Sequence, residues 1–460
     1  MAEPIMDLVI EDGGVVHDAG RFIGSVGIKD GKIAALRNSW SSARLRGKRT
    51  IDARGKLVLP GVIDVHVHME MPVGRLHTAD DFSSGSIAGA FGGVTTMIDF
   101  AIQPKGKSLL DAIERRKDAA LGKSAIDFSL HGAITDWNDR TRREMKTAVK
   151  RGVTSFKLFM TYEERGLMAD DGVLYECLEE ASSLGALVGV HAENARLIDA
   201  FTRKAVASGK RGAILHALSR PNVSESEAVG RAIYLASACS TKIYIFHVST
   251  LEACDVIARW TKRGYPVFAE TCPQYLVLDE SSFRRPDGAL FATCPPVRKA
   301  PDRARLWEAL ERKTIDVVAT DHCSFTRAQK ATWRGDFRKI PCGLPGIETS
   351  LPLLVTRGVG KQISLRTLVD VLSTNPAKIF GLYPRKGTIR VGSDADLAII
   401  DPGRELRVTP RSLHMKSDYS PYEGMRLRGF PSVTILRGKV VQQGGEFLGA
   451  PGDGVFLKRN

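Results

Sequence analysis

His66 and His68 stand one residue apart at the end of an apolar run that begins after Pro60. In a strand, residues i and i+2 face the same side, so both imidazoles are expected to point together from one strand end. Two convergent imidazoles make half of a typical metal site. An ordinary strand with two hydrogen-bonded histidines gives the same short pattern, so the rest of the chain must separate these two interpretations.

More candidate ligands end other apolar segments of the chain: Lys157, His191, His247 and Asp321. Nitrogen and oxygen donors without thiolate suit zinc, and manganese, cobalt and iron also match them. Four histidines and an aspartate are too many for one catalytic ion that keeps an open position. This count favours a centre of two ions with a shared ligand.

Lys157 is the unusual member of this set. A protonated ammonium beside two dications is electrostatically untenable. Reaction of the amine with CO2 would turn the cation into a bridging carboxylate. A lysine that points outward or pairs with a carboxylate would need no such chemistry, and spacing alone leaves both interpretations open.

The elements that must position these side chains repeat as buried strand, polar end and helix, eight times between residues 56 and 385. Parallel strands need crossover helices, so this alternation predicts an α/β fold with a (β/α)8 TIM barrel, whose active site lies at the C-terminal strand ends. Short alternating strands at both termini predict a small β-sandwich domain from residues 1–55 and 386–445. Residues 446–460 form a tail that begins glycine-rich, expected to be mobile or to dock on a neighbouring subunit.

Composition narrows the function classes. The chain has 460 residues, of which 43% are hydrophobic and 26% charged, and this is ordinary globular usage. The net charge of +14 is spread along the chain without a nucleic-acid-reading motif, so neither nucleic acid nor membrane is expected as a partner. The seven scattered cysteines favour reduced thiols, and no signal peptide is evident near the start, which favours the cytoplasm.

These motifs together resemble the dihydropyrimidinase/hydantoinase family, the cyclic amidohydrolases of the amidohydrolase superfamily. The matching stretches run nearly from end to end, at residues 60–68, 79–82, 92–100, 155–162, 191–194, 247–249, 270–276, 320–323, 392–397 and 422–425. Few of these stretches are diagnostic alone, but their occurrence together and in this order is highly specific for the family. The resemblance implies a homotetramer that opens the ring amide of dihydropyrimidines or 5-substituted hydantoins to give N-carbamoyl amino acids.

The resemblance also implies roles for single residues. Two zinc ions would be bridged by carboxylated Lys157, with Asp321 also serving as general base and Tyr162 donating a hydrogen bond to the developing oxyanion. The remaining ligands would divide between the two ions, one set being His66, His68 and Asp321 and the other His191 and His247.

Several positions bear on the substrate. Cys294 and Cys342 stand where the family often has serine and asparagine; the family contacts to the ring amide there run largely through backbone groups, so ring recognition can survive. Val73 and Phe159 match positions that line the pocket for the exocyclic group, which predicts tolerance of apolar substituents. Glu70 occupies the place of the carboxylate-binding arginine of dihydroorotases and would repel an acidic substrate.

Alternatives remain at this level. Allantoinase or another cyclic-amide hydrolase would use the same ligands, although the loop after His68 differs from the usual allantoinase loop. Collapsin response mediator proteins share the fold as non-enzymatic scaffolds, but they lack the metal ligands that are all present here. A nucleic-acid binder is suggested only by the charge, and a salt-sensitive shift on mixing with DNA would support it.

Overall fold

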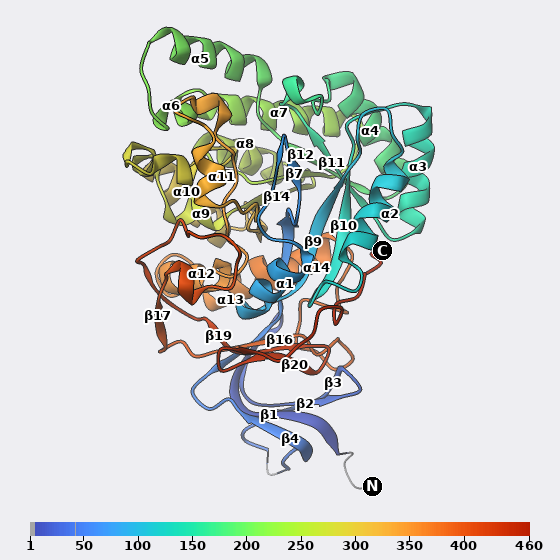
Figure 1. The fold of residues 1–460 in the computed structure, drawn as a ribbon. Helices are drawn as coiled ribbons and strands as arrows, with labels where there is room; N and C mark the ends of the chain where they lie inside the picture. The colour runs from blue at the N-terminus through green and yellow to red at the C-terminus, as the bar shows by residue number, and fades with distance from the viewer. Residues whose placement is uncertain (1–4, 42) are drawn as a thin grey trace.

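A computed structural model describes residues 5–41 and 43–460 of the chain. A barrel with surrounding helices lies above a β-rich layer that carries the N-terminus at its far end (Figure 1). The first four residues, part of the stretch on which the absence of a signal peptide was judged, lie outside the described residues. Within the described residues, no helix is both long and apolar enough to cross a membrane.

Eight parallel strands form the barrel in the order of the sequence. Backbone hydrogen bonds close it between the first strand and the segment after the last, from His68 N to His322 O at 2.8 Å and from His322 N to His66 O at 3.3 Å. The predicted fold class is thereby confirmed. The strands are β6 (Val62–Val67), β9 (Val94–Ile102), β10 (Asp127–Ala133), β11 (Ser155–Phe159), β12 (Leu187–His191), β13 (Ile243–Ile245), β14 (Val267–Thr271) and β15 (Val317–Val318).

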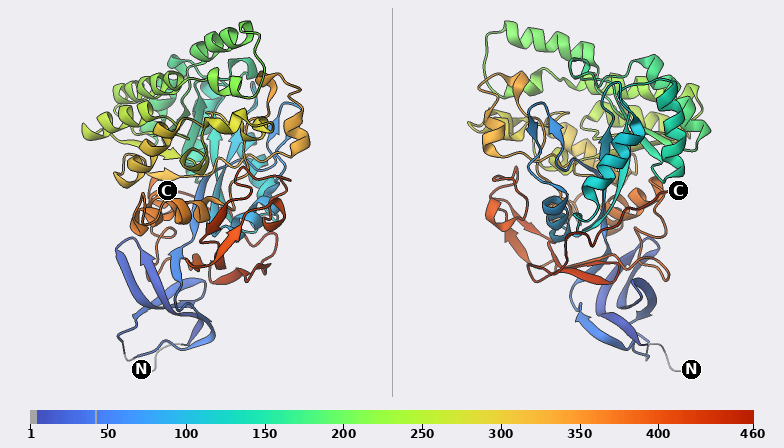
Figure 2. Two further views of the ribbon diagram at one scale, coloured as in Figure 1. Left: turned by 90° about the vertical axis from the view of Figure 1, so that its left-hand side faces the viewer. Right: turned by 45° about the vertical axis from the view of Figure 1, so that its right-hand side comes forward.

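Helices follow these strands and cover the barrel from outside (Figures 1 and 2). Many begin at a serine, threonine, aspartate or asparagine whose side chain accepts a hydrogen bond from a free backbone N–H of the first turn, as at Asp81, Ser108 and Thr250. The longer ones are α1 (Phe82–Phe91), α2 (Leu109–Ala120), α3 (Asp139–Lys150), α4 (Asp171–Ser183), α5 (Ala195–Ala207), α7 (Asn222–Ala238), α8 (Leu251–Lys262), α10 (Ala300–Glu311) and α12 (Ser350–Arg357).

Short helical turns occupy the connections after the barrel strands. They are η1 (Glu163–Arg165), α6 (Ile214–Leu218), α9 (Pro273–Val277), η2 (Glu280–Arg284), η3 (Gly288–Phe291), α11 (Arg327–Ala331), η4 (Phe337–Lys339), α13 (Leu365–Val369), the π-helical η5 (Asp370–Thr374), α14 (Asn375–Ile379) and η6 (Pro410–Ser412). A small hairpin, β7 (Pro72–Val73) and β8 (Leu76–His77), follows the first barrel strand, and β17 (Glu405–Arg407) pairs with β18 (Arg426–Arg428).

Both ends of the chain build the β-rich layer, as the sequence predicted. Strand β5 lies at its centre because it pairs in parallel with β1 and antiparallel with β16. Residues 57–60 therefore belong to this layer, although the domain boundary was expected at residue 55. The strands are β1 (Met6–His17), β2 (Gly20–Lys29), β3 (Lys32–Asn38), β4 (Gly47–Asp52), β5 (Leu57–Pro60), β16 (Leu397–Ile400), β19 (Pro431–Leu436), β20 (Lys439–Gln443) and β21 (Glu446–Phe447).

The barrel interior holds a separate apolar cluster that includes Val65, Phe100 and Phe246. The pairing of β6 with β9 shifts register between Asp64 and Val67, the sign of a β-bulge. His66 contacts the rings of Phe100 and Phe246 as well, so the bulge lets two consecutive residues face the interior. This irregularity aims His66 into the barrel.

The C-terminal tail differs from the expectation of a mobile or intersubunit segment, because it packs on its own barrel (Figure 2). Phe128 N donates to Val455 O at 3.0 Å, and Leu457 N donates to Phe128 O at 2.7 Å. Arg459 is only 2% exposed, and its guanidinium donates to the hydroxyls of Ser129 and Ser155. Polar atoms of β10 and β11, among them the carbonyl of Leu130, stabilise this guanidinium.

Candidate metal centre

The structure brings the predicted metal ligands together at the C-terminal side of the barrel. His66 lies in β6 and His68 just after it, while Lys157 lies in β11 and His191 ends β12. His247 follows β13 and Asp321 follows β15. All six side chains are buried although they are polar or charged. This convergence from five strands is the arrangement that an active site of this fold uses.

Asp321 joins the first half of the cluster. Its Oδ1 lies 3.2 Å from Nε2 of His66 and 3.3 Å from Nε2 of His68. Nε2 of His66 also lies 3.0 Å from Nζ of Lys157. Two ring nitrogens this close to one carboxylate oxygen can share a metal ion with it without large movement.

His191 and His247 form the second half, with ring centroids 4.4 Å apart. The ring of His247 lies 5.5 Å from that of His66, so the two halves are adjacent. His247 has a φ of 40° and Asp321 a φ of 50°, a conformation that costs side-chain-bearing residues free energy. Such strain at ligands indicates that the surrounding structure fixes their directions.

Two carboxylates orient the histidines, and the ligand prediction did not include them. Glu270 Oε1 lies 2.5 Å from Nδ1 of His66, and Glu193 Oε2 lies 2.8 Å from Nε2 of His191. Each contact leaves the other ring nitrogen available to a metal. Glu270 lies near the end of barrel strand β14, so its position in the sequence could have marked it as a site residue. Glu193 lies two residues beyond the end of β12, and its position marks it less clearly.

Burial sets the charge of these groups. Desolvation lowers the pKa of His66 and His247 well below the usual imidazole value, and it also lowers the pKa of His68 and His191. Neutral imidazoles are the form that binds a metal. Burial also lowers the pKa of Lys157 to about 8, although the charge of Asp321 opposes it. A substantial fraction of this amine is therefore neutral near pH 8.

These residues fit a metal centre. The buried Nε2 atoms of His66 and His68 face Oδ1 of Asp321 at 3.2 and 3.3 Å, which is the donor chemistry of a metal site. Neutral ring nitrogens and a carboxylate oxygen also crowd within a few ångströms, an arrangement that a cation would stabilise. His66, His68 and Asp321 form a group whose ligand atoms all lie within 4.8 Å of one another.

Tyr162 lies beside the second half, with its ring 5.0 Å from that of His191. Its φ of 67° is left-handed, and the side chain is half-buried. Burial raises the pKa of its phenol well above the usual value, so the hydroxyl keeps its proton. The guanidinium of Arg220, which also pairs with Glu193 at 2.6 Å, lies 5.6 Å from this ring.

The other predicted substrate contacts divide into two groups. Phe159 packs 6.1 Å from both Tyr162 and His191, ring to ring, whereas half-buried Val73 lies in the β7–β8 hairpin. Cys294 and Cys342 lie together near His216, and all seven cysteines are described and free. Hydrogen bonding with Cys294 lowers the pKa of Cys342 to about 7.

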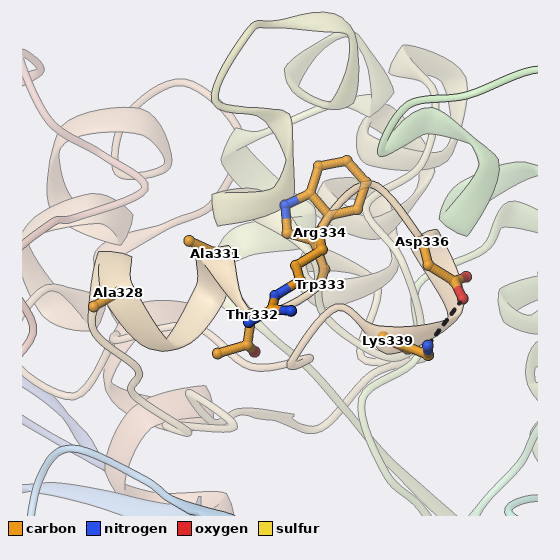
Figure 3. Close-up of a pocket in the computed structure, with 7 residues that line it drawn as sticks. All are labelled: Ala328, Ala331, Thr332, Trp333, Arg334, Asp336 and Lys339. Carbon is orange, nitrogen blue, oxygen red and sulfur yellow. Dashed lines mark ion pairs between the residues drawn. The ribbon is translucent and has the colours of Figure 1, made fainter.

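Figure 3 shows a surface hollow lined by residues of α11, of η4 and of the turn between them. Trp333 and Arg334 line it, and an ion pair of 3.7 Å joins Lys339 to Asp336 at its edge. None of its lining residues belongs to the metal cluster or to the predicted substrate contacts. The hollow therefore does not compete with the cluster as a candidate active site.

Glu270→Gln tests the orienting role. We expect metal affinity to fall by about 10- to 100-fold, because the amide no longer fixes the tautomer of His66 with a charged acceptor. Competition with a coloured chelator measures this loss. Glu348→Gln is the matched control, since Glu348 is a buried carboxylate that pairs with His414 at 2.7 Å outside the cluster. Equal affinities in the two variants would contradict the role.

The barrel and its histidine–carboxylate cluster are those of a metal-dependent hydrolase, and comparison with known proteins specifies the family. The model of the Amidohydrolase family matches residues 57–441. A D-hydantoinase from Geobacillus stearothermophilus is 44% identical over 459 residues, which are 99% of this chain and 97% of that protein. A D-hydantoinase from Rhizobium radiobacter is 43% identical, with 99% of each chain covered.

A crystal structure gives the same result. The dihydropyrimidinase from Brevibacillus agri NCHU1002 superposes with a TM-score of 0.94 at 41% identity, with 98% of each chain covered. The chain belongs to the amidohydrolase superfamily and, within it, to the hydantoinase and dihydropyrimidinase family. Family and cluster together suggest a binuclear metal centre.

Proposed function

We propose that this enzyme hydrolyses the cyclic amide bond of 5-substituted hydantoins or dihydropyrimidines and releases N-carbamoyl amino acids. The convergence of four histidines, Lys157 and Asp321 at the strand ends carries the proposal. Relatives named D-hydantoinase, similar over nearly the whole chain, support this substrate class.

The proposed cofactor is a pair of zinc ions, and manganese, cobalt and iron also suit the donors. His66, His68 and Asp321 would hold one ion, and His191 and His247 the other. When bound, the ions supply Lewis acidity that activates water and polarises the amide carbonyl.

Lys157 would link the two halves as a carboxylated lysine. The neutral amine attacks CO2, a C–N bond forms, and one proton leaves to solvent. The lowered pKa of Lys157, about 8, supplies the neutral amine that this step needs. The product is an anion at a position where an ammonium would repel metal ions.

Asp321 is the proposed general base. Its carboxylate lies at the centre of the cluster, where it can accept a proton from the attacking water. The same group then delivers that proton to the ring nitrogen that leaves. Tyr162 keeps its phenolic proton and donates a hydrogen bond to the oxygen that gains charge.

Tyr162→Phe is expected to lower kcat by about 10²- to 10³-fold while KM changes little, because the hydroxyl acts on charge that develops only in the transition state. Steady-state kinetics measure this division. Tyr234→Phe is the control, since Tyr234 is 63% exposed on α7. A Tyr162→Phe enzyme with unchanged kcat would exclude the oxyanion role.

Phe159 and Val73 are proposed to line the pocket for the exocyclic substituent. Phe159→Ala should change the ranking of aryl and methyl hydantoins, with discrimination altered by about tenfold, since one large apolar contact contributes roughly 1–3 kcal/mol. Competition assays with paired substrates give this ratio. An unchanged ranking would remove Phe159 from the specificity pocket.

The function is tested by metal analysis coupled to turnover of dihydrouracil, hydantoin and allantoin before and after chelation. We expect two metal ions per chain, opening of dihydrouracil or hydantoin, and loss of activity on chelation. Preferred opening of allantoin would favour allantoinase. A chain with neither metal nor turnover would be a scaffold.

Two further parts of the proposal concern the cellular state. A homotetramer is proposed from the family resemblance, and light scattering coupled to gel filtration tests it. Seven free thiols support a reducing compartment such as the cytoplasm, and fractionation of the native host tests that location.

A further inference from the structure

A second cluster of metal-binding side chains lies outside the histidine–carboxylate centre. Nε2 of His216 is 3.9 Å from Sγ of Cys342 and 4.0 Å from Sγ of Cys294. All three atoms lie within 4.8 Å of one another. His216 lies in α6, whereas the two cysteines belong to loops after η3 and η4, so three separate segments build the cluster.

We propose that His216, Cys294 and Cys342 form a third metal site, for one thiophilic cation such as zinc or cadmium. Zinc lies about 2.3 Å from sulfur and about 2.0 Å from nitrogen in tetrahedral sites, which places such donors ~3.6–3.8 Å apart. The observed separations need only a small contraction to reach this geometry. Three protein donors leave a fourth position for water or another ligand.

Charge and protons balance at this site. Two thiols lose their protons to solvent, and the resulting thiolates offset the charge of a dication. Nε2 of His216 now donates to the carbonyl of Thr293 at 2.9 Å. Metal binding moves this proton to Nδ1 of the same ring, so the imidazole stays neutral.

Nearby cations favour the thiolate form before the metal arrives. Lys330 and Arg220 both act electrostatically on Cys342. Lys330 is 1% exposed and its Nζ donates to the carbonyl of Ala292, two residues before Cys294, at 2.9 Å. Cys342 is thus the thiolate that meets the metal first, in a buried, electropositive environment. The hydrogen bond to Cys342 and burial raise the pKa of Cys294, so this second thiol loses its proton only on metal binding.

The site is close to the proposed reaction centre. Arg220, which acts on both thiols, packs on Tyr162. The thiol of Cys323, two residues after Asp321, donates to the carbonyl of Cys342 at 3.8 Å. A bound cation would fix the two loops beside the pocket, so excess zinc should inhibit turnover; this consequence rests on the proposed function.

The binding test uses cadmium added to the metal-loaded enzyme with a phosphine reductant. We expect one additional equivalent of cadmium per chain and a new ultraviolet thiolate-to-cadmium band. Cys294→Ser/Cys342→Ser should lose that band, and His216→Asn should raise the half-saturating cadmium concentration at least about tenfold. Cys177→Ser/Cys254→Ser is the matched control, because both residues are buried free thiols on other helices.

Several outcomes would overturn the site: no additional equivalent in the unchanged enzyme, a band that survives the Cys294→Ser/Cys342→Ser change, or a disulfide between the two cysteines in place of the metal. Soaking crystals of the unchanged enzyme with cadmium gives an anomalous peak among the three side chains and does not depend on variant folding. Neither readout needs substrate, so failure of the proposed function would leave them intact. Inhibition of turnover by excess zinc is then measured in both proteins. We expect the inhibitory zinc concentration to be at least about tenfold higher in Cys294→Ser/Cys342→Ser than in the unchanged enzyme.

Discussion

Lys157→Met is expected to lower kcat/KM by about 10³-fold or more, because a metal centre contributes several kcal/mol to transition-state stabilisation and each 1.4 kcal/mol is tenfold. Methionine keeps the volume within the rings of Phe100 and Phe246 but removes the amine. The purified variant should hold fewer than two metal ions per chain. Elemental analysis and steady-state kinetics on the same sample measure both effects.

Lys330→Met is the matched control, since burial also lowers the pKa of Lys330 to about 8. This variant should keep both ions of the histidine–carboxylate centre. In the unchanged protein, metal-free enzyme given zinc and 13C-labelled CO2, at the same dissolved CO2 concentration at both pH values, should recover activity faster at pH 9 than at pH 6, because the neutral amine of Lys157 increases as pH rises through about 8. A carbamate signal in the 13C spectrum is expected with recovery; full activity without it would contradict carboxylation.

Deleting residues 455–460 is expected to destabilise the protein by roughly 3–5 kcal/mol or to prevent folding. The deletion removes buried Leu457, Arg459 and the backbone bonds to β10, and it leaves polar atoms of the barrel without partners. Thermal unfolding followed by circular dichroism measures the change as a lower apparent Tm.

Arg459→Ala removes the guanidinium and keeps the rest of the tail. We expect this variant to show most of the stability loss caused by the deletion. Arg54→Ala is the control because Arg54 is exposed and, within the described residues, forms an ion pair with Asp52 alone, so its change should stay within about 0.5 kcal/mol. Equal melting temperatures for Arg459→Ala and Arg54→Ala would show that the Arg459 guanidinium does not stabilise the barrel.

The barrel could be predicted because each strand is a short apolar run that ends in a polar residue. The β-rich layer was foreseen from its turns, but the place of β5 within it was not, since pairing with β1 and β16 depends on contacts distant in sequence. The glycines at the start of the tail suggested a segment that is mobile or docks on a neighbouring subunit. The contact of Arg459 with Ser129 spans 330 residues, and no local pattern reports such a contact.

In the candidate site, too, local sequence patterns predicted some features, and contacts between distant residues determine the others. The structure places His66 and His191 at or next to strand ends, as predicted, whereas Lys157 is the central residue of β11 and not its end. The bulge in β6 and the left-handed φ of His247 and Asp321 are tertiary effects, because burial on all sides compensates for local strain. The grouping of His216 with two loop cysteines could not be predicted from the sequence either, because one helix and two loops share no periodic pattern.

The packing of the C-terminal tail on the barrel affects the order in which the chain folds during synthesis. Domains generally fold as units while synthesis proceeds from the N-terminus. Here Ser129 and Ser155 emerge from the ribosome more than 300 residues before Arg459, and β5 emerges long before its partner β16. The nascent barrel must therefore wait with the hydroxyls of Ser129 and Ser155 without their guanidinium partner until Arg459 has been made. Insertion of the tail is therefore among the last steps in the folding of the barrel.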